Sequence, residues 1–423
     1  MTLFSPKVTY WMKTLGKFVS VQLVVQVLGM VSGIFLVRTL DQRQYAYYTI
    51  ALTMQTTMNL LADMGISIGL SSIGGKVWHD KYRFGQLINT ALRLRFVLAV
   101  IAILVVTPIL LWMLIKNGAS PLYASLITIV VLIGLNFQLT TVVLVVVPRL
   151  HSQISRVRNL DLVAAISRLA LLGAAYLTWF NAAVAIATTS VVFGLQRLIL
   201  GRWVADSIDT KAPINQEDRK FILTKVRELA PNSIFFCIQT QLSVWLISIF
   251  GNTNNVAEIG ALGRIAIIFA VLASIMNSIV LPSFTRCQSR KLLRVRYFQV
   301  LSLYLVFGLL LIGVSALFPG ELIWILGNKY SHLKNELTLV IISMVFTSII
   351  DTMWSLNAAK GWVQYAWTEI PTRIVIQIAL LLVLDISTLR GVIFFSIFSS
   401  ISPFFVNAFL SFQGLRYVEE SIQ

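Results

Sequence analysis

Long apolar segments alternate with short polar ones along the whole chain. A transmembrane helix needs about 20 mainly apolar residues, and twelve segments meet that requirement. The first half contains Phe18–Val37, Tyr45–Ser71, Phe96–Ile115, Leu122–Val147, Leu162–Phe180 and Ala182–Leu200. The second half contains Pro231–Phe250, Val256–Phe284, Phe298–Phe318, Leu337–Ala359, Pro371–Leu384 and Gly391–Phe412. The pattern predicts an all-α polytopic membrane protein with twelve transmembrane helices.

Basic residues in the loops provide an independent test of this span count. If the N-terminus is cytoplasmic, 27 of the 34 Lys and Arg residues fall in cytoplasmic loops or at the inner ends of spans, and six fall outside. The remaining one, Arg264, lies deep in the eighth span. Cytoplasmic loops of membrane proteins carry an excess of Lys and Arg. The distribution therefore favours twelve spans with both termini in the cytoplasm.

The largest polar segment, Gly201–Leu229, lies at the middle of the chain and ends in an amphipathic stretch, Phe221–Leu229. Such a stretch can lie along the membrane surface. The segments Leu36–Leu52 and Leu246–Leu262 show weakly similar patterns on either side of it. We therefore expect an N-terminal six-helix lobe over residues 1–200, a cytoplasmic linker over residues 201–230, and a C-terminal six-helix lobe over residues 231–423.

The second span carries an unusual polar face. Its polar residues recur at steps of three or four, which places them on one side of a helix. They are Thr49, Thr53, Thr56, Asn59 and Asp63, with Gln55 next to Thr56. A polar face with a carboxylate is unfavourable in lipid unless it faces protein or water. Two interpretations of Asp63 are open: hydrogen bonding to neighbouring helices, or a functional role in a polar cavity.

Four further spans contain polar groups. In the first span, Gln22 and Gln26 share a face with Gly29 and Gly33, a GxxxG pair for which close helix packing is the alternative explanation. The other groups are Asn232, Gln239 and Ser243 in the seventh span, Arg264 in the eighth, and Thr347, Asp351 and Ser355 in the tenth. Asp63 and Asp351 are the only acids, and Arg264 the only base, deep inside the predicted spans.

These charges either form an ion pair that joins helices or line a water-filled cavity between the halves, in which Arg264 meets an anionic substrate. An arginine in mid-span is disfavoured by about 2.5–3.5 kcal/mol on insertion scales, so it needs an acid or an anion as its partner. The internal repeat sets Arg264 beside Met54, about 13 Å of helix rise from Asp63, which disfavours a direct ion pair. The amides and hydroxyls that accompany the charges favour the cavity.

Composition excludes several other classes of protein. The chain has 423 residues, of which 57% are hydrophobic and 12% charged, against roughly 25% charged in soluble domains. The cytoplasmic loops account for the net charge of +17, and no soluble, basic and aromatic-rich segment suited to nucleic acid occurs. Two cysteines and three scattered histidines form no disulfide framework or metal motif. The loops are too short for a catalytic domain, so we do not expect an enzyme.

Short motifs in both halves resemble those of one known group. The first half contains Arg38-Thr-Leu40, then Tyr45 and Tyr48, then Ala62-Asp63-Met64-Gly65-Ile66. The second half contains Ile325-Leu326-Gly327-Asn-Lys-Tyr330 and Leu356-Asn357-Ala358-Ala359-Lys360-Gly361. With the length and the two six-span halves, these motifs resemble the Wzx-type polysaccharide (O-antigen) flippases of the multidrug/oligosaccharidyl-lipid/polysaccharide (MOP) exporter superfamily. The resemblance implies a V-shaped, MATE-like bundle of two lobes.

The resemblance also implies a function, the flipping of an undecaprenyl-diphosphate-linked oligosaccharide for surface polysaccharide biosynthesis by alternating access. Arg264 would then bind the diphosphate through charge-assisted hydrogen bonds. Sugar hydroxyls would meet Gln22, Gln26, Gln55, Asn59 and Gln239. Asp63 and Asp351 would carry a coupling proton or sodium ion, as ionisable groups at membrane depth do in transporters. Further basic groups would have to come from the cytoplasmic side, from Arg93, Arg95 or Arg168.

Partners and location follow from the same resemblance. The expected partners are the polyprenyl-diphosphate-linked oligosaccharide, the lipid bilayer, and a polysaccharide polymerase with other assembly proteins, with neither nucleic acid nor a cofactor. The expected location is the bacterial inner (cytoplasmic) membrane. The main alternative is a cation-coupled multidrug exporter of the same superfamily, in whose cavity acids are favoured over Arg264. A more remote alternative is a membrane enzyme of polysaccharide assembly, which would need a larger catalytic loop.

Overall fold

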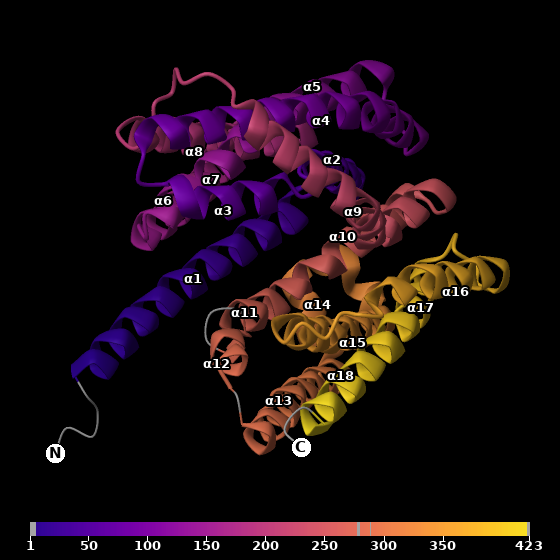
Figure 1. The fold of residues 1–423 in the computed structure, drawn as a ribbon. Helices are drawn as coiled ribbons and strands as arrows, with labels where there is room; N and C mark the ends of the chain where they lie inside the picture. The colour runs from indigo at the N-terminus through magenta and orange to yellow at the C-terminus, as the bar shows by residue number, and fades with distance from the viewer. Residues whose placement is uncertain (1–5, 277–279, 288, 421–423) are drawn as a thin grey trace. The chain divides into compact units, whose positions relative to one another are not determined.

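The computed structural model of the chain describes residues 6–276, 280–287 and 289–420. All the elements in these ranges are helices and no strand occurs among them, which confirms the all-α prediction (Figure 1). By its contacts the chain divides into two compact units, Met1–Ile249 and Phe250–Gln423. The three-part division expected from the sequence, with a linker over residues 201–230, stays a prediction.

The first unit is built from long helices that pack side by side. Its helices are α1 (Pro6–Thr39), α2 (Gln42–Leu61), α3 (Ile66–Val77), α4 (Lys81–Lys116), α5 (Pro121–Leu144), α6 (Val146–Leu150), α7 (Ile154–Tyr176), α8 (Ala182–Ala205) and α9 (Gln216–Phe250), whose last residue begins the second unit. Helix α5 packs along α8, α2 along α4, and α1 along α7. A buried apolar cluster joins α3, α4, α8 and the first turns of α9.

The second unit contains shorter and more interrupted helices. They are α10 (Thr253–Leu262), η1 (Gly263–Ala266), α11 (Ile267–Ile275), α12 (Leu281–Thr285), α13 (Arg290–Leu317), α14 (Pro319–Leu326), η3 (Asn328–Leu333), α15 (Lys334–Ala359), η4 (Ala366–Thr368), α16 (Glu369–Val383), α17 (Leu389–Ser399) and α18 (Ile401–Glu420). Helix α15 is central in this unit, because it packs against α13, α17 and α18. A smaller buried cluster lies where α12, α13 and α15 meet.

Eleven helices in the described residues are long and apolar enough to cross a membrane. The second of the twelve predicted spans is the one missing from this set. It corresponds to α2, whose threonines and amides lower its hydropathy, although its 20 residues give about 30 Å of helix, enough for the hydrocarbon core. Asn181 separates α7 from α8 as the span boundaries predict, and its side chain caps α8 by accepting a hydrogen bond from the Val184 amide at 3.0 Å.

Two helices extend well beyond the predicted spans. Helix α4 begins at Lys81, whereas the third predicted span begins at Phe96. Helix α9 begins at Gln216, so the amphipathic stretch predicted over Phe221–Leu229 is helical and continues without a break into the seventh span. The predicted boundaries are wrong here because hydropathy detects only the part of a helix that lies in the hydrocarbon core. A helix can continue beyond this core through polar residues.

The second predicted span is interrupted after α2. Met64 and Gly65 adopt positive φ angles of 35° and 100°, so the chain leaves α2, turns, and starts α3 at Ile66. A Cβ atom on Gly65 would lie 2.9 Å from the Leu229 Cδ1 atom of α9. Both the left-handed backbone and the close approach of α9 therefore explain the glycine of the Ala62–Ile66 motif.

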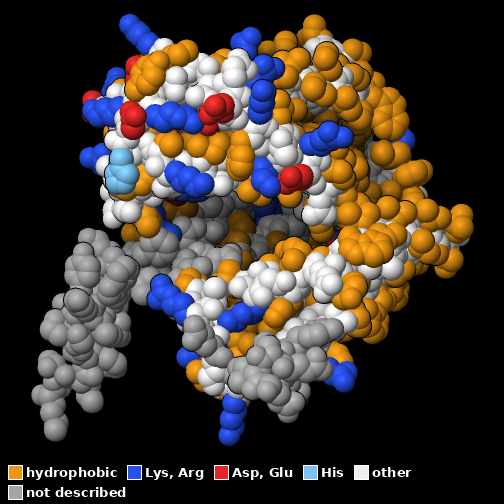
Figure 2. Space-filling model, in the orientation of Figure 1, with side chains coloured by type: hydrophobic (Ala, Val, Ile, Leu, Met, Phe, Trp, Pro, Cys, Tyr) orange, Lys and Arg blue, Asp and Glu red, His pale blue; other side chains and the backbone are white. Residues whose placement is uncertain are grey.

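Charge is unevenly distributed on the surface of the first unit. In Figure 2, Lys and Arg side chains gather toward the left of this unit, over the ends of α3, α6 and α8. Hydrophobic side chains cover its right side, over α4 and α5. Such a separation is typical of membrane proteins, whose basic residues accumulate at the cytoplasmic end.

We expect Gly65→Ala to lower the free energy of unfolding by about 1–2 kcal/mol, because an L side chain strains the left-handed turn and displaces Leu229. The matched control is Gly75→Ala, at an exposed position of α3 where an added Cβ meets nothing within 4 Å. Alanine favours a helix over glycine, so the control should melt at or above the wild-type temperature. Thermal melting of the detergent-purified proteins measures both, and equal melting temperatures for the two variants would contradict this assignment.

Candidate functional site

Asp63 lies in the turn between α2 and α3 and forms an ion pair with Arg95 of α4. The Asp63 Oδ1 atom accepts hydrogen bonds from Arg95 Nη1 at 2.9 Å and from Ser67 Oγ at 2.6 Å. The second guanidinium nitrogen of Arg95 donates to Asn59 Oδ1 at 2.9 Å. The Arg95 side chain is 1% exposed and that of Asp63 is 27% exposed. One buried cation thus joins the end of α2, the start of α3, and α4.

This geometry matches the first of the two interpretations of Asp63, hydrogen bonding to neighbouring helices. Its partner, Arg95, is a residue that the sequence pattern assigns to the loop before the third span. A buried charge without a counter-charge is strongly destabilising, so the pair has a clear structural role. A coupling role for Asp63 stays a prediction.

Two further arginines on α7 are directed at polar groups of α1 and α2. Arg158 Nη1 donates to Gln22 Oε1 of α1 at 2.9 Å. Arg168 Nη2 donates to the Tyr48 hydroxyl of α2, also at 2.9 Å. Asp161, on the same helix, lies within electrostatic range of Arg158. Arg168 is 14 residues into the 23-residue helix, about 21 Å of rise, which is near the middle of the span.

The expectation that Arg264 is the only base deep in a span is therefore wrong. The loop-charge pattern assigns Arg168 to the cytoplasmic side, because the fifth predicted span begins only six residues before it. In the described part of the chain, Arg168 donates to a neutral hydroxyl, its Nε atom has no hydrogen-bond partner, and no ion pair includes it. Of the other basic residues expected to contribute, Arg95 is held by Asp63 and Arg93 is exposed.

Two of the amides predicted to meet substrate already orient arginines. Gln22 accepts the hydrogen bond from Arg158, and Asn59 accepts one from Arg95. On the Gln22 face of α1, a Cβ added at Gly29 would meet nothing within 4 Å. The close-packing explanation of the GxxxG pair is therefore unsupported at this glycine.

The remaining predicted amides lie in three different environments. Gln55 is buried between α2 and α5, where its Nε2 atom donates to Gln138 Oε1 at 3.3 Å. The Oε1 atom of Gln55 has no hydrogen-bond partner among the described residues. Gln26 is half-buried on α1, and Gln239 is half-buried on α9. Their contacts with a substrate stay predictions.

Arg264 lies in the second unit at an interruption of its helix. Helix α10 ends at Leu262, the 3₁₀ turn η1 covers Gly263–Ala266, and α11 begins at Ile267. A short 3₁₀ segment inside a helix often marks a functional hinge. The Arg264 side chain is half-buried. Its contact with an anionic substrate stays a prediction.

A cavity of about 380 Å³ lies beside Asp351 in the second unit, among η1, α11, α13 and α15. The Asp351 carboxylate is exposed and shares the cavity with the hydroxyl groups of Ser343, Thr347, Ser348, Thr352 and Ser355. The structure thus places Thr347, Asp351 and Ser355 together, as their four-residue spacing predicts. Within the described residues, no three His, Cys, Asp or Glu side chains gather as a metal site requires.

A second acid and a base on α16 complete the charges near this cavity. Arg373 Nη1 donates to Glu369 Oε1 at 3.3 Å, and these side chains are 16% and 7% exposed. The Arg373 guanidinium also acts electrostatically on Asp351. Sequence reasoning missed this pair, because it lies at the edge of the short eleventh predicted span and Arg373 counts there as a loop residue. A coupling cation at Asp351 would have to compete with Arg373.

The second-half motif that contains Asn357 and Lys360 joins helices of the second unit. Asn357 is fully buried, donates to the backbone carbonyl of Asn407 at 3.0 Å, and accepts from Ser411 Oγ at 2.9 Å. Lys360 Nζ donates to the backbone carbonyl of Cys287 at 2.7 Å. These contacts connect α15 with α18 and with the chain after α12, so the motif has a structural role.

Comparison with solved structures identifies the fold. An inward-facing multidrug resistance transporter of the MATE family in the MOP superfamily aligns with a TM-score of 0.70 and 17% identity over 96% of this chain and 100% of that one. A MOP superfamily transporter from Pyrococcus furiosus Vc1, described by a binding pocket of reverse polarity that suggests a different function, aligns with a TM-score of 0.63 and 15% identity over 94% and 93%. The eukaryotic MATE transporter AtDTX14 aligns with a TM-score of 0.58 and 15% identity over 96% of both chains.

No protein-family model and no curated protein matches the sequence. At 15–17% identity, the structural likeness establishes the fold alone. The predicted fold class is confirmed at this level, whereas the Wzx-type branch remains a proposal. The chain is a multi-pass membrane protein with a MATE-like fold.

We expect Asp63→Asn to lower the free energy of unfolding by about 3 kcal/mol, because Arg95 would remain buried without a counter-charge. Adding Arg95→Met to this variant removes the stranded charge and should restore part of the loss. The control is Glu228→Gln, which breaks an exposed ion pair with Lys225 that is worth at most about 1 kcal/mol. Thermal melting in detergent compares the three variants. An Asp63→Asn protein that melts like the wild type would show that the pair contributes little.

Proposed function

We propose that the protein is a flippase for an undecaprenyl-diphosphate-linked oligosaccharide in surface polysaccharide biosynthesis. The observation that carries the proposal is Arg168, a guanidinium in the middle of α7 whose hydrogen bond goes to the neutral Tyr48 hydroxyl. An arginine at this depth is disfavoured by about 2.5–3.5 kcal/mol. No acid among the described residues forms an ion pair that would offset this cost. An anionic substrate would offset it during transport.

A diphosphate matches the basic groups of the first unit. Guanidinium binds phosphate oxygens through two parallel hydrogen bonds, which a single ammonium group cannot do. Arg158 lies ten residues before Arg168 on α7, about 15 Å of helix rise away, and offers a second such group. Two positive sites along one helix give a diphosphate successive partners, while its polyprenyl tail stays in lipid.

Sugars attached to the diphosphate need hydrogen-bonding groups rather than charges. Gln22 lies beside Arg158 and presents such a group next to a proposed phosphate partner, whereas Asn59 lies beside Arg95. The proposal retains the other predicted contacts, which are Gln26, Gln55, Gln239 and Arg264. Alternating access requires helices that can bend, and the interruptions at η1 and after α2 supply two such points.

For ion coupling the proposal gives Asp351 the larger role. Asp351 faces a hydroxyl-lined cavity, whereas Asp63 is held by Arg95. A proton or a sodium ion at Asp351 would change its electrostatic interaction with Arg373 of α16. The proposed location is the bacterial inner membrane with both termini cytoplasmic, in agreement with the basic end of the first unit in Figure 2.

A cation-coupled multidrug exporter of the same superfamily is the second candidate function. The cavity beside Asp351 favours it, because acids attract cationic drugs and Glu369 lies close by. The arginines of α7 favour the flippase, because they repel cations. The two functions predict different phenotypes for a deletion strain.

We expect deletion of the gene to abolish or strongly reduce the surface polysaccharide and to cause carrier-linked oligosaccharide to accumulate inside the cell. Mass spectrometry of extracted polyprenyl-linked saccharides and gel analysis of surface polysaccharide measure the two effects. The exporter alternative predicts unchanged polysaccharide and increased sensitivity to cationic dyes. Unchanged polysaccharide without accumulation would refute the flippase.

We expect Arg168→Gln to reduce transport about tenfold or more, since a hydrogen bond to a charged group is worth about 1.5–3 kcal/mol. Arg168→Lys keeps the charge but loses the two-pronged geometry, so it should restore part of the activity. The matched control is Arg156→Gln, an exposed arginine in the first turn of the same helix. Each variant is expressed in the deletion strain, and surface polysaccharide is compared at equal protein levels in the membrane. Equal activity for Arg168→Gln and Arg156→Gln would remove the main support for the proposal.

A further inference from the structure

A groove of about 450 Å³ in the second unit combines apolar walls with a basic end. It is bordered by α13, α15 and α18. Arg294 lies four residues after the start of α13, and Arg416 lies four residues before the end of α18. Both side chains are exposed and line the groove, so its basic end is formed at these two helix ends. We propose that this groove binds an anionic membrane phospholipid through its phosphate headgroup.

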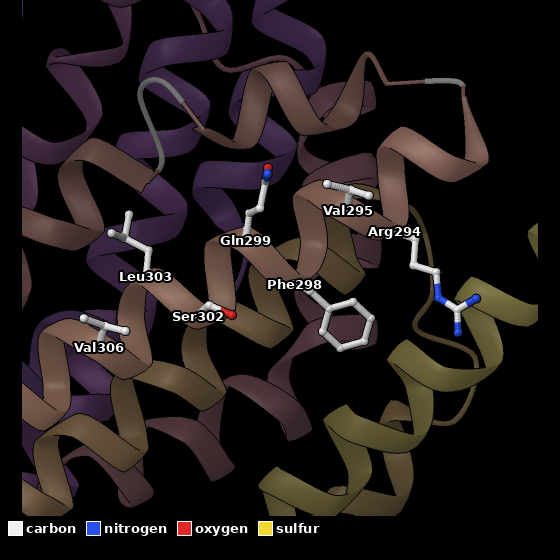
Figure 3. Close-up of a pocket in the computed structure, with 7 residues that line it drawn as sticks. All are labelled: Arg294, Val295, Phe298, Gln299, Ser302, Leu303 and Val306. Atoms are coloured by element: carbon white, nitrogen blue, oxygen red, sulfur yellow. The ribbon is translucent and has the colours of Figure 1, made fainter.

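A second apolar depression, of about 700 Å³, runs along α13 from the same arginine. The two share Arg294 and Phe298. In Figure 3, Arg294 and Phe298 point toward the neighbouring helix α18, whereas Gln299 and Leu303 point to the other side of α13. Two apolar depressions therefore begin at Arg294, one on each side of Phe298. A phospholipid has the same arrangement, with one charged headgroup and two acyl chains.

The walls of the groove suit acyl chains. Phe298 and Phe412 are 53% and 64% exposed, and they line it together with Leu301, Met353 and Leu415. Among the side chains that the structure describes, none of those that line either depression is acidic. Acyl chains can pack against these apolar walls, and none of the described lining side chains repels a phosphate.

Hydrogen bonds beneath the groove hold its three helices together. The Tyr297 hydroxyl of α13 and Ser411 Oγ of α18 are 2.5 Å apart, and Ser411 Oγ donates to Asn357 Oδ1 of α15 at 2.9 Å. All three side chains are buried. The groove is therefore preformed, and a lipid can bind without first ordering its walls.

The depth of the arginines matches that of a headgroup. The membrane-crossing part of α13 has 27 residues, about 40 Å of helix, whereas the hydrocarbon core is about 30 Å thick. Its first turns, with Arg294, therefore extend to the headgroup level, where long basic side chains reach phosphate. The cytoplasmic leaflet carries anionic lipids that attract such basic residues. This site does not depend on what the protein transports.

The test uses the full-length protein purified in neutral detergent. Native mass spectrometry and thermal melting are recorded with phosphatidylglycerol, with phosphatidylcholine of the same chains, and with inorganic phosphate. Phosphatidylglycerol should bind and raise the melting temperature, whereas phosphatidylcholine and inorganic phosphate should have much weaker effects. If phosphatidylcholine bound and stabilised the protein as well as phosphatidylglycerol, the negative charge would not matter. If inorganic phosphate did so, the acyl chains would not matter. Either result overturns the proposal.

Paired variants locate the site. Arg294→Gln with Arg416→Gln should weaken phosphatidylglycerol binding about tenfold or more, because each basic group near an anionic headgroup contributes several-fold in affinity. The control is Arg286→Gln with Lys291→Gln, which removes the same net charge from exposed residues outside both depressions. It should weaken binding less than about threefold. The single Arg294→Gln and Arg416→Gln variants should give intermediate losses. Equal losses of phosphatidylglycerol affinity for the two double variants would contradict the proposed site.

Discussion

A charged side chain at membrane depth is unfavourable unless another group neutralises or solvates it. In the first unit, Arg95 is neutralised by Asp63 and hydrogen-bonded to Asn59, and the result is a rigid junction between α2, α3 and α4. In the second unit, Arg373 meets Glu369 and acts on Asp351. Arg168 differs from both, because its partner is the neutral hydroxyl of Tyr48. An anionic substrate would supply the negative charge that the Tyr48 hydroxyl does not offer to Arg168.

In the second unit, polar groups that hold helices together have different surroundings from those proposed to bind a substrate or a coupling ion. Asn357 and Ser411 are buried, fully engaged with one another, and connect α15 with α18. Asp351 instead faces a cavity, and Arg264 lies at a break between α10 and α11. Cavities and helix interruptions are where a transporter can bind and move, whereas the engaged networks hold the surrounding helices in place.

The all-α class and most of the spans could be predicted from the sequence, because long apolar runs and loop charge report directly on the membrane. The face that Thr347, Asp351 and Ser355 share could also be predicted, since helical spacing fixes which residues project together. The spacing of residues in one helix says nothing about which other helix approaches it. For that reason the partner of Asp63 could not be found from the sequence.

Arg168 and Arg373 were both assigned to the cytoplasmic side of the membrane for a common reason. Both lie inside predicted spans but within six residues of the start, and the loop-charge count assigns basic residues near a span end to the adjoining loop. Hydropathy placed the start of the third span at Phe96 and so assigned Arg95 to the loop before it, although α4 begins at Lys81. The polar residues of α2 lower its hydropathy. Its length is sufficient to cross the membrane, but it is not among the eleven described helices that are apolar enough to do so. Hydropathy does not show where a helix continues through polar residues beyond the membrane, as α4 and α9 do.

We propose that the arginines of α7 carry a diphosphate across the membrane. The most direct test of this proposal is a flipping assay with purified protein in proteoliposomes, using a fluorescent saccharide on a short polyprenyl diphosphate and an impermeant quencher added outside. We expect rapid exchange between leaflets with the wild-type protein, and slow exchange both with the Arg168→Gln protein and when the saccharide is carried on a neutral lipid of the same chain length. Equal exchange for the diphosphate and the neutral lipid, unaffected by Arg168→Gln, would contradict the proposal.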